Sequence, residues 1–191
     1  MNYKILVETS ARHIHLTREH CEILFGEDFK LHKKKELSQP GQFACVERVA
    51  VIGPRNQFAG VTILGPFRSE TQVELSASDA FFLGIKAPVR RSGDLAGSGS
   101  CILAGPCGQI ELKQGVIIAK RHIHIDDMEA EKLGIQDGQL ISVKIQSDDR
   151  SLAFGDVVVR TSRGHIPVMH IDTDEANAAG CAGTVYGEII L

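Results

Sequence analysis

Two short segments of this 191-residue chain, "SARHIHLT" at 10–17 and "AKRHIHID" at 119–126, share the tetrapeptide Arg-His-Ile-His. Histidine is the side chain best suited to carry a proton near neutral pH, and its neutral imidazole is a common metal ligand. Two histidines two positions apart, repeated in the second half of the chain, therefore indicate metal chemistry more strongly than one such pair alone would.

Strand geometry explains why the spacing matters. Side chains alternate between the two faces of a β-strand, so His13 and His15 are expected to project together while Ile14 and Leu16 pack on the other face. Neighbours on one face lie about 7 Å apart, which lets both rings reach one metal ion. Arg12 is expected on the face of Ile14, and its role stays open. The same alternation separates His122 and His124 from Ile123 and Ile125.

Each histidine pair needs a third ligand. Zinc suits neutral imidazole, and a catalytic zinc site has three protein ligands and one open position. Glu74 in "TQVELS" faces away from the apolar side of its segment, and His170 in "PVMHIDTDEAN" precedes a short helix, so these two residues are the candidates. The remaining candidates are weaker, because they suit solvated or packing imidazoles: His20, His32 and His165.

Arg68 stands six residues before Glu74 in "GPFRSETQVELS". A guanidinium fork matches phosphate geometry, so an arginine near a cation site suggests an anionic substrate, although most arginines are simply solvated. The glycine-rich segment that follows, "RRSGDLAGSGSCILAGPCGQ", has no Gly-Lys-Ser/Thr and is not a Walker A loop. Its composition predicts a loop, which is either a linker or a cradle for a phosphate-bearing ligand.

Composition restricts the class of protein. Apolar residues make up 43% of the chain, enough for packed cores in one large or two small domains. A net charge of −3 with no tryptophan does not suit nucleic-acid binding, and no run approaches the length of a membrane span. Five cysteines without a CxxC pair favour reduced thiols, so we expect a cytoplasmic protein. Because the charge and the few aromatic residues do not suit nucleic-acid binding, we expect a small-molecule substrate.

Short β-rich runs bounded by glycine, proline, aspartate or serine predict barrels or sandwiches with few helices. The expected strands are "YKILVE", "FACVERVAVI", "FAGVTIL", "TQVEL", "GVIIAKRHIHI", "QLISVKI", "DVVVR", "HIPVMHI" and "TVYGEIIL". Four short helices are expected at 18–25, 79–83, 127–133 and 174–179, each ending at a glycine. Ser78, Asp126 and Thr173 are the expected N-caps, with Glu129 completing a capping box.

The similarity between the two halves extends beyond the histidines. Both "RHIHLTREHCEILFG" and "RHIHIDDMEAEKLG" read as strand, cap, short helix and glycine, and "PGQFACVERV" then parallels "DGQLISVKI". Two related β units are therefore expected. The first copy carries about a dozen extra residues near "GEDFKLHKKKEL", which suit a flap or a longer loop.

Five ordered motifs resemble one family, the PduL-type phosphotransacylases, also called phosphate propanoyltransferases. The motifs are "SARHIHLT", "GPFRSETQVELS", "SGDLAGSGSCILAGPCG", "AKRHIHID" and "HIDTDEAN". The resemblance covers essentially the whole chain. It implies a phosphate acyltransferase that reversibly converts a short-chain acyl-CoA and phosphate to acyl phosphate and CoA.

The resemblance also implies a mainly β fold of two related β-barrels with short capping helices and a metal site between them. Barrel one is expected from 2–11 plus 113–191 and barrel two from 12–112, with a flap-like insert at about 26–46 and a glycine-rich loop at 92–108. Two divalent metal ions, zinc by preference, are implied, with Arg68 binding phosphate. The implied metal ligands are His13, His15, Glu74, His122, His124 and His170.

Several further expectations follow from the resemblance. The substrates are acetyl-CoA or propanoyl-CoA, and a homodimer is a possible assembly. Because no Ser-His or Cys-His nucleophile pair is evident in the motifs, phosphate is expected to attack the thioester directly, with Cys101 and Cys107 as the thiols to test against that idea. Family members in microcompartments carry an N-terminal targeting helix, which is not seen here and favours a free cytosolic enzyme. The expected CoA-binding residues are Arg90, Arg91, Gly97, Gly99, Gly105 and Gly108.

Two other classes remain as alternatives. A double cupin, a metal-dependent oxygenase or isomerase, would use Glu19 or Glu129 after each histidine pair. Both glutamates lie in the first turns of expected helices, where negative charge has a simple dipole role. The other alternative is a zinc-stabilised binding module without activity, but six candidate ligands shared by two ions leave open positions, unlike a closed structural site.

Overall fold

The computed structural model describes residues 3–191 of the chain, which form two compact units. Unit 1 contains residues 3–10, 38–40 and 120–191, and unit 2 contains residues 11–37 and 41–119. Each unit has its own sheet and its own hydrophobic core, so each is described by itself.

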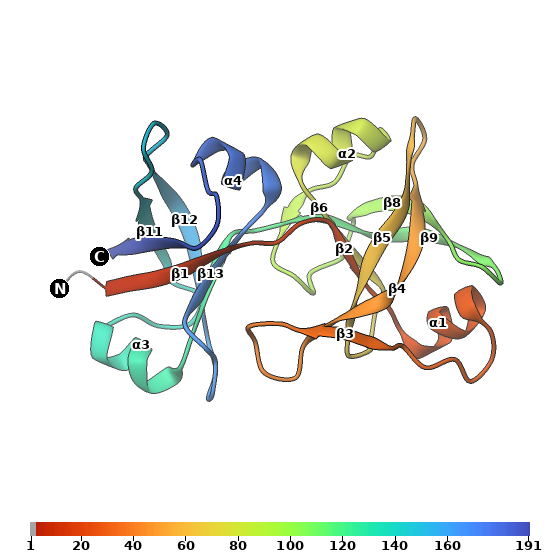
Figure 1. The fold of residues 1–191 in the computed structure, drawn as a ribbon, viewed down its shortest axis with the longest axis horizontal. Helices are drawn as coiled ribbons and strands as arrows, with labels where there is room; N and C mark the ends of the chain where they lie inside the picture. The colour runs from red at the N-terminus through yellow and green to blue at the C-terminus, as the bar shows by residue number, and fades with distance from the viewer. Residues whose placement is uncertain (1–2) are drawn as a thin grey trace. The chain divides into compact units, whose positions relative to one another are not determined.

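Unit 1 is a closed barrel of six strands in the order β1-β13-β10-β12-β11-β14. The first and last strands of the chain pair antiparallel and close the ring, so β1 and β14 lie side by side in Figure 1. The strands are β1 (Tyr3–Thr9), β10 (His122–Ile125), β11 (Leu140–Ile145), β12 (Leu152–Thr161), β13 (Val168–Ile171) and β14 (Val185–Ile190).

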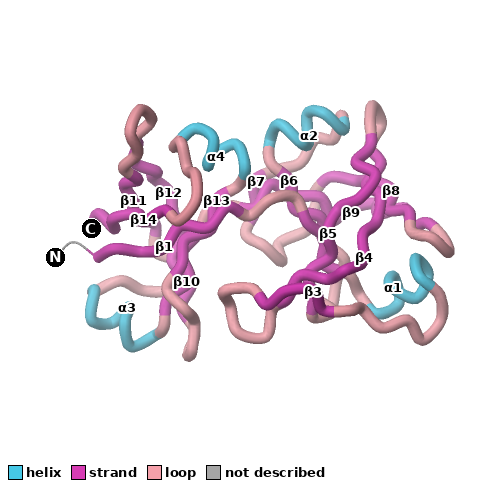
Figure 2. Tube along the Cα trace, in the orientation of Figure 1, coloured by secondary structure: helices cyan, strands magenta, loops and turns pink. Residues whose placement is uncertain are grey.

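Unit 2 has an eight-stranded sheet in which six strands form a second ring. The linear order is β3-β4-β5-β2-β6-β9-β7, and β8 closes the ring by pairing with both β4 and β9. Figure 2 shows how strands dominate over the short helices. The strands are β2 (His13–His15), β3 (Lys33–Glu36), β4 (Phe43–Ile52), β5 (Gln57–Gly65), β6 (Gln72–Leu75), β7 (Val89–Arg90), β8 (Gly99–Ala104) and β9 (Gln109–Ala119).

The two rings have the same topology. In unit 2, β2 pairs parallel with β5 and antiparallel with β6, and in unit 1, β10 pairs parallel with β12 and antiparallel with β13. Around the rest of the ring β4, β8 and β9 take the places of β11, β14 and β1, with every pairing direction kept. The expected fold class of two related β-barrels is confirmed.

Alternation along the histidine strands separates core from site. Ile14 and Ile123 are both fully buried, and each packs into the core of its own unit. Burying such a side chain contributes roughly 1.5–3 kcal/mol, so the isoleucines anchor these strands in the barrels. The histidines on either side of each isoleucine consequently point out of the barrel interior.

Four short helices follow the strands that carry the candidate ligands: α1 (Arg18–Phe25), α2 (Ala77–Leu83), α3 (Asp127–Leu133) and α4 (Thr173–Ala178). The expected helices are confirmed, but two caps are wrong, because Ser76 rather than Ser78 caps α2 and Asp172 rather than Thr173 caps α4. Asp126 caps α3 as expected. The capping box lies at α4, between Asp172 and Glu175, rather than at α3. The true caps stand one or two residues nearer the preceding strand, because each strand ends directly in the cap.

The structure draws several boundaries differently from the sequence. Residues 113–119 belong to unit 2 as the end of β9, and residues 38–40 belong to unit 1. The expected strand 115–125 is broken before β10. The glycine-rich segment 92–108 is not all loop, because β8 runs through it, and the insert at 26–46 contains β3 and the start of β4. Residue 2 of the expected first barrel lies outside the described residues.

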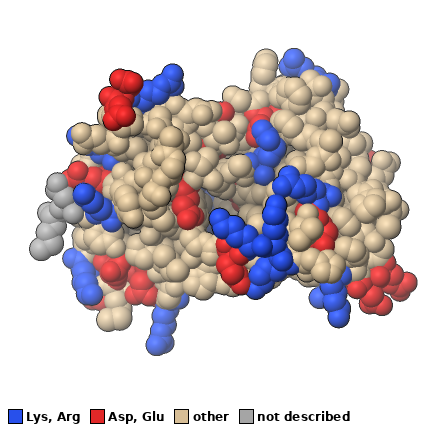
Figure 3. Space-filling model, in the orientation of Figure 1, with Lys and Arg blue, Asp and Glu red and all other residues tan. Residues whose placement is uncertain are grey.

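The surface charges and the short helices agree with what the composition predicts. Lysine, arginine, aspartate and glutamate side chains are interspersed with uncharged atoms on the face drawn in Figure 3. Among residues 3–191 no helix is both long enough and apolar enough to cross a membrane.

Candidate functional site

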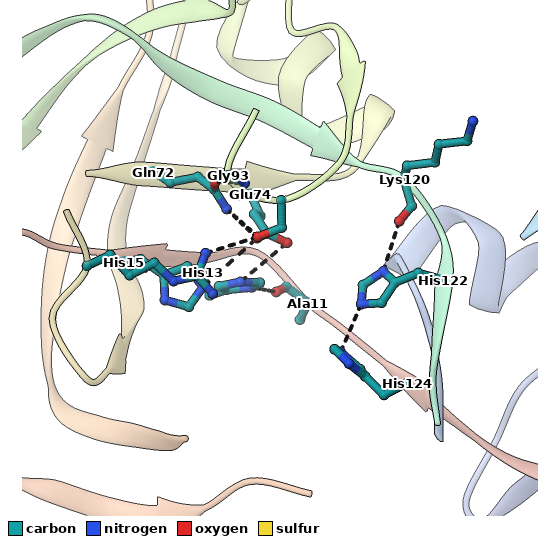
Figure 4. Close-up of polar contacts among 11 residues, drawn as sticks. Ala11, His13, His15, Gln72, Glu74, Gly93, Lys120, His122 and His124 are labelled. Atoms are coloured by element: carbon teal, nitrogen blue, oxygen red, sulfur yellow. Dashed lines mark hydrogen bonds and ion pairs between the residues drawn. The ribbon is translucent and has the colours of Figure 1, made fainter. Parts of the chain in front are cut away.

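The strand pairing of unit 2 brings His13, His15 and Glu74 together. His13 of β2 is the direct partner of Glu74 on the antiparallel strand β6. One ligand atom from each of the three residues lies within 4.8 Å of the other two, and all three side chains are buried. Figure 4 shows both imidazoles turned toward the Glu74 carboxylate. The expected third ligand of this group therefore lies beside its histidine pair.

A polar network holds the Glu74 carboxylate in place. Ser92 Oγ donates a hydrogen bond of 2.8 Å to Glu74 Oε1, and Gln72 Nε2 donates to the same oxygen. Gln72 Nε2 also lies 2.9 Å from Ser92 Oγ, and Gln72 Oε1 accepts a 2.7 Å hydrogen bond from the backbone of Gly93. Arg68 Nη1 donates to Ser92 Oγ at 3.0 Å. The start of the glycine-rich segment is thereby tied to the candidate ligand.

The three candidate ligands of unit 2 shift one another's pKa values. Although burial alone would lower it, the Glu74 carboxylate raises the pKa of His13. Burial lowers the pKa of His15 to about 3, and the charges of His13 and Arg68 act in the same direction. Burial by itself would raise the pKa of Glu74, but the two histidines hold it below its ordinary value. The Glu74 carboxylate is therefore held in its anionic form, and a positive charge on His13 disfavours a second one on His15.

The corresponding residues of unit 1 are His122, His124 and His170. His122 of β10 pairs directly with His170 of β13, as His13 pairs with Glu74 in unit 2. The three side chains each offer a nitrogen within 4.8 Å of the others, and His122 Nε2 lies 3.2 Å from His124 Nε2. Figure 4 shows the contact between these two rings. Burial, together with the two neighbouring histidines, lowers the pKa of His124 to about 2.

The hydrogen bonds at both groups suit metal binding. His13 Nδ1 lies 2.9 Å from the carbonyl of Ala11, and His122 Nδ1 lies 2.9 Å from the carbonyl of Lys120. A carbonyl only accepts, so Nδ1 carries the proton and Nε2 presents its lone pair to the group. His122 Nε2 and His124 Nε2, 3.2 Å apart in a buried site, can share one proton or can both bind one cation. The donor sets, two imidazoles with a carboxylate and three imidazoles, are both types that zinc accepts.

The second histidine of each pair has one buried ring nitrogen without a hydrogen bond. The Nδ1 atoms of His15 and His124 are buried and have no hydrogen-bond partner among the described residues. Buried polar atoms are normally satisfied, so these two Nδ1 atoms are exceptions at equivalent positions of the two units.

Arg12 has a clear structural role, which the sequence left open. Its guanidinium forms a two-pronged ion pair with Asp79 of α2, with Nη2 2.6 Å from Oδ1 and Nε 3.0 Å from Oδ2, and lies 4.1 Å from the ring centre of Phe58. Arg121 repeats this in unit 1, where Nη1 donates to Glu175 of α4 and the guanidinium lies over Phe154. Each arginine therefore ties a histidine strand to the helix that follows the third ligand.

The proposed CoA-binding residues fall into two groups. Gly105 and Gly108 pack against the end of α1, where an added Cβ would lie 2.5 Å from the carbonyl oxygen of Leu24 and 2.6 Å from that of Ile23. Gly99 is buried, and a Cβ there would meet Ile85. These three glycines thus have packing reasons of their own. The others lie at or near the surface: Arg90, which pairs with Asp94, exposed Arg91 and exposed Gly97.

Of the remaining histidines and the cupin glutamates, none belongs to either ligand group, and only His165 is seen to pack against a ligand histidine. His20 Nδ1 contacts Thr71 Oγ1, and exposed His32 pairs with Glu47. Glu19 is exposed, and Glu129 accepts a hydrogen bond from the Tyr3 hydroxyl, so neither glutamate joins its histidine pair. His165 is different, because its ring packs edge-on against His124 with centres 4.7 Å apart.

Neither ligand group includes a cysteine of the described residues. Cys101 is buried in β8, and burial raises the pKa of its thiol to about 12, so the thiolate is not accessible near neutral pH. Cys107 is exposed in the turn after β8, where its backbone N–H donates to Leu24 of α1.

Four residues near the ligands were missed by sequence reasoning. Gln72 and Ser92 support Glu74, while Glu8 and Ser38 form a chain that ends at His170. Gln72 could have been found, because it lies two residues before Glu74 on the same face of β6. The other three come from segments distant in sequence and carried no local signal.

Comparisons with known proteins agree with the fold and the motifs. The family model described as phosphate propanoyltransferase matches residues 6–182. A phosphate propanoyltransferase of Listeria monocytogenes is 48% identical over 184 residues, covering 96% of this chain and 86% of the relative. Those of Clostridioides difficile and Thermotoga maritima are 47% and 49% identical, covering 97% and 92% of this chain and 88% and 83% of the relatives.

The two-barrel fold and these relatives define an acyltransferase. More narrowly, the chain belongs to the phosphate propanoyltransferase family, which confirms the resemblance read from its motifs. The double-cupin and non-enzymatic alternatives have no support from these relatives.

Proposed function

We propose that this acyltransferase moves a short acyl group reversibly between CoA and phosphate, with propanoyl-CoA or acetyl-CoA as the donor. The observation that carries the proposal is the chain of contacts from Arg68 through Ser92 to Glu74. It connects the side chain best suited to bind phosphate with the carboxylate of a candidate metal group. The names of the relatives favour the propanoyl group.

The proposed cofactors are two divalent metal ions, with zinc preferred because the ligands are mostly neutral imidazoles. One ion is held by His13, His15 and Glu74, and the other by His122, His124 and His170. A bound zinc ion would supply Lewis acidity toward a carbonyl or phosphoryl oxygen and affinity for a thiolate.

The residues of the chain have separate tasks in this reaction. Arg68 has five N–H donors, of which Nη1 is directed to Ser92, and the guanidinium binds and orients phosphate. Ser92 and Gln72 keep the Glu74 carboxylate fixed, and the Ala11 carbonyl keeps the proton of His13 on Nδ1. Holding phosphate in one orientation removes much of the entropy cost of a bimolecular encounter.

The proposed transfer is a direct displacement. A phosphate oxygen attacks the thioester carbonyl carbon, so that a C–O bond forms, the C–S bond breaks and CoA leaves as a thiolate that takes up the proton released by phosphate. No acyl-enzyme is proposed, because Cys101 is buried with a raised pKa and Cys107 lies at the turn against α1.

The test is a thiol-release assay with propanoyl-CoA and acetyl-CoA, with and without phosphate, before and after chelation. We expect CoA release that requires phosphate, stops after chelation and returns with zinc. Release without phosphate would instead show a thioesterase, and no release with either donor would contradict the proposed reaction. Activity that survives complete removal of metal would contradict the role of the ions.

A further inference from the structure

Glu8 of β1 lies beside the third histidine of unit 1. Its Oε2 is 3.2 Å from His170 Nε2, and the two residues are direct partners across the parallel pair β1 and β13. The same oxygen accepts a 2.7 Å hydrogen bond from Ser38 Oγ. The carboxylate is therefore held from two sides, by the backbone register and by a hydroxyl.

The contact determines which ring nitrogen of His170 carries a proton. An ionised carboxylate only accepts, so a contact of 3.2 Å requires the proton on Nε2. A neutral imidazole protonated at Nε2 has its lone pair on Nδ1. Among the described residues, the ligand atoms within 4.8 Å of one another in unit 1 come from the three histidines and not from Glu8. Glu8 thus contacts His170 without belonging to the ligand group.

Unit 2 provides an internal comparison. The position that corresponds to Glu8 is Ile117 of β9, because Ile117 pairs with Glu74 as Glu8 pairs with His170. Unit 2 therefore has its carboxylate in the ligand group and a buried isoleucine behind it, whereas unit 1 has a histidine in the group and the carboxylate behind it. Each unit thus has one carboxylate at its site, but on non-equivalent strands: Glu74 on β6, which corresponds to β13, and Glu8 on β1, which pairs with β13.

We propose that Glu8 is a positioning residue of the three-histidine site, which accepts a hydrogen bond from His170 Nε2 and so directs His170 Nδ1 toward the bound ion. His122 binds through Nε2, since its Nδ1 faces the Lys120 carbonyl, so the two histidines use opposite nitrogens. A carboxylate behind a histidine ligand fixes the ring and makes it a stronger donor. This inference rests on the proposed metal function in one respect only, namely that the partner of His170 Nδ1 is a metal ion.

The experiment measures the protonation of the ring nitrogens directly. Long-range proton–nitrogen correlation spectra of the uniformly nitrogen-15-labelled full chain are recorded without metal and with zinc, and His170 is assigned by the signals lost in His170→Asn. We expect the Nε2-protonated form of His170 in both states of the wild type. In Glu8→Leu that preference is lost, and the zinc affinity of this site falls by about 10–100-fold in chelator competition.

Two variants separate positioning from a general structural effect. Glu8→Gln keeps an oxygen that can accept from Nε2 and is expected to preserve the protonated form and most of the zinc affinity. Glu188→Leu is the matched control, because Glu188 is a half-buried carboxylate of unit 1 on β14, a strand that carries none of the ligands. It is expected to leave both measurements unchanged.

Several results would overturn the inference. Coordination of His170 through Nε2 in the zinc-loaded protein would do so, as would a Glu8→Leu variant that keeps the wild-type protonation and affinity. A protein that binds no zinc would refute the proposed metal function, whereas the spectra without metal would still decide whether Glu8 sets the protonation of His170.

Discussion

The two barrels have one topology but differently charged ligand groups. In unit 2 the residue opposite the first histidine is Glu74, and in unit 1 it is His170. The Glu74 carboxylate raises the pKa of His13 against the effect of burial. Burial lowers the pKa of the second histidine in both units, to about 3 for His15 and to about 2 for His124. Strand register thus fixes where a third ligand stands, while the residue type at that position sets the charge of the site.

This difference bears on what each site does with a bound dication. A carboxylate ligand neutralises part of the ion's charge, whereas three neutral imidazoles leave that charge available to an incoming anion. Glu8 contacts His170 but is not one of the ligand residues, so it is expected to neutralise less of the ion's charge than a direct carboxylate ligand would. We therefore expect the three-histidine site to be the stronger binder of anions.

Removing one histidine from either unit should break the comparison most severely. His13→Ala and His122→Ala should each lose one metal equivalent and retain the other, because the two ligand groups share no residue. Turnover should fall by about 10³-fold or more in both variants, since an ion's charge stabilisation is worth several kcal/mol. Metal content by mass spectrometry and thiol release measure the two effects.

The control for the histidine variants is His32→Ala, because His32 is exposed and pairs with Glu47 away from the ligands. It should keep both metal equivalents. Loss of both ions from a single-site variant would show that the two groups are not independent.

Replacing Arg68, which belongs to unit 2, should weaken the use of phosphate without removing either metal ion. Arg68→Ala is expected to lower kcat/KM for phosphate by about 10–100-fold while both metal equivalents remain, because hydrogen bonds to a charged group are worth roughly 1.5–3 kcal/mol. The measurement is a phosphate titration of thiol release. Arg163→Ala is the matched control, since exposed Arg163 lies between β12 and β13 as Arg68 lies between β5 and β6. Undiminished phosphate use in Arg68→Ala would remove the phosphate-binding role.

Replacing Arg12 or Arg121 should have a smaller effect, confined to the unit that contains the arginine. Arg12→Lys and Arg121→Lys keep the charge but lose the planar fork, so each histidine strand is held less firmly to the helix after its third ligand. We expect about a tenfold weaker zinc affinity at the affected site only, and roughly 1 kcal/mol lower stability because the ion pairs are partly exposed. Site-resolved chelator competition and urea unfolding measure these changes, and equal weakening of both sites by Arg12→Lys would contradict the assignment.

Much of this site could be predicted because its residues obey local rules. The strand period put His13 and His15 on one face and His122 and His124 on another. Glycines cap α1, α2 and α3 at the expected positions, whereas the C-cap of α4 is Ala179, one residue before the expected Gly180. The repeat then indicated two units, which the matching rings confirm.

What could not be predicted depends on strand pairing over long distances. Glu8 meets His170 only because β1 inserts beside β13, and Ser92 meets Glu74 only because the glycine-rich segment returns to β6. The strand β8 was missed because glycine and serine dominate its neighbourhood, although it closes the ring of unit 2. The partner of Arg12, Asp79, lies 67 residues further along the chain.

The smallest effect is expected for the cysteines, which form another difference between the units. Unit 2 has Cys101 in β8 and Cys107 just after it, whereas the corresponding strand of unit 1, β14, has no cysteine. If phosphate attacks the thioester directly, this difference has no catalytic meaning. Cys101→Ala and Cys107→Ser should then keep turnover within about twofold, because a deleted nucleophile costs many orders of magnitude whereas a packing change does not. A labelled acyl-CoA, quenched and examined by intact-protein mass spectrometry, should leave no acyl adduct on the wild type. An acyl adduct that disappears in Cys107→Ser, together with collapsed turnover, would replace direct attack with a two-step transfer through unit 2 and would make the barrels catalytically unequal.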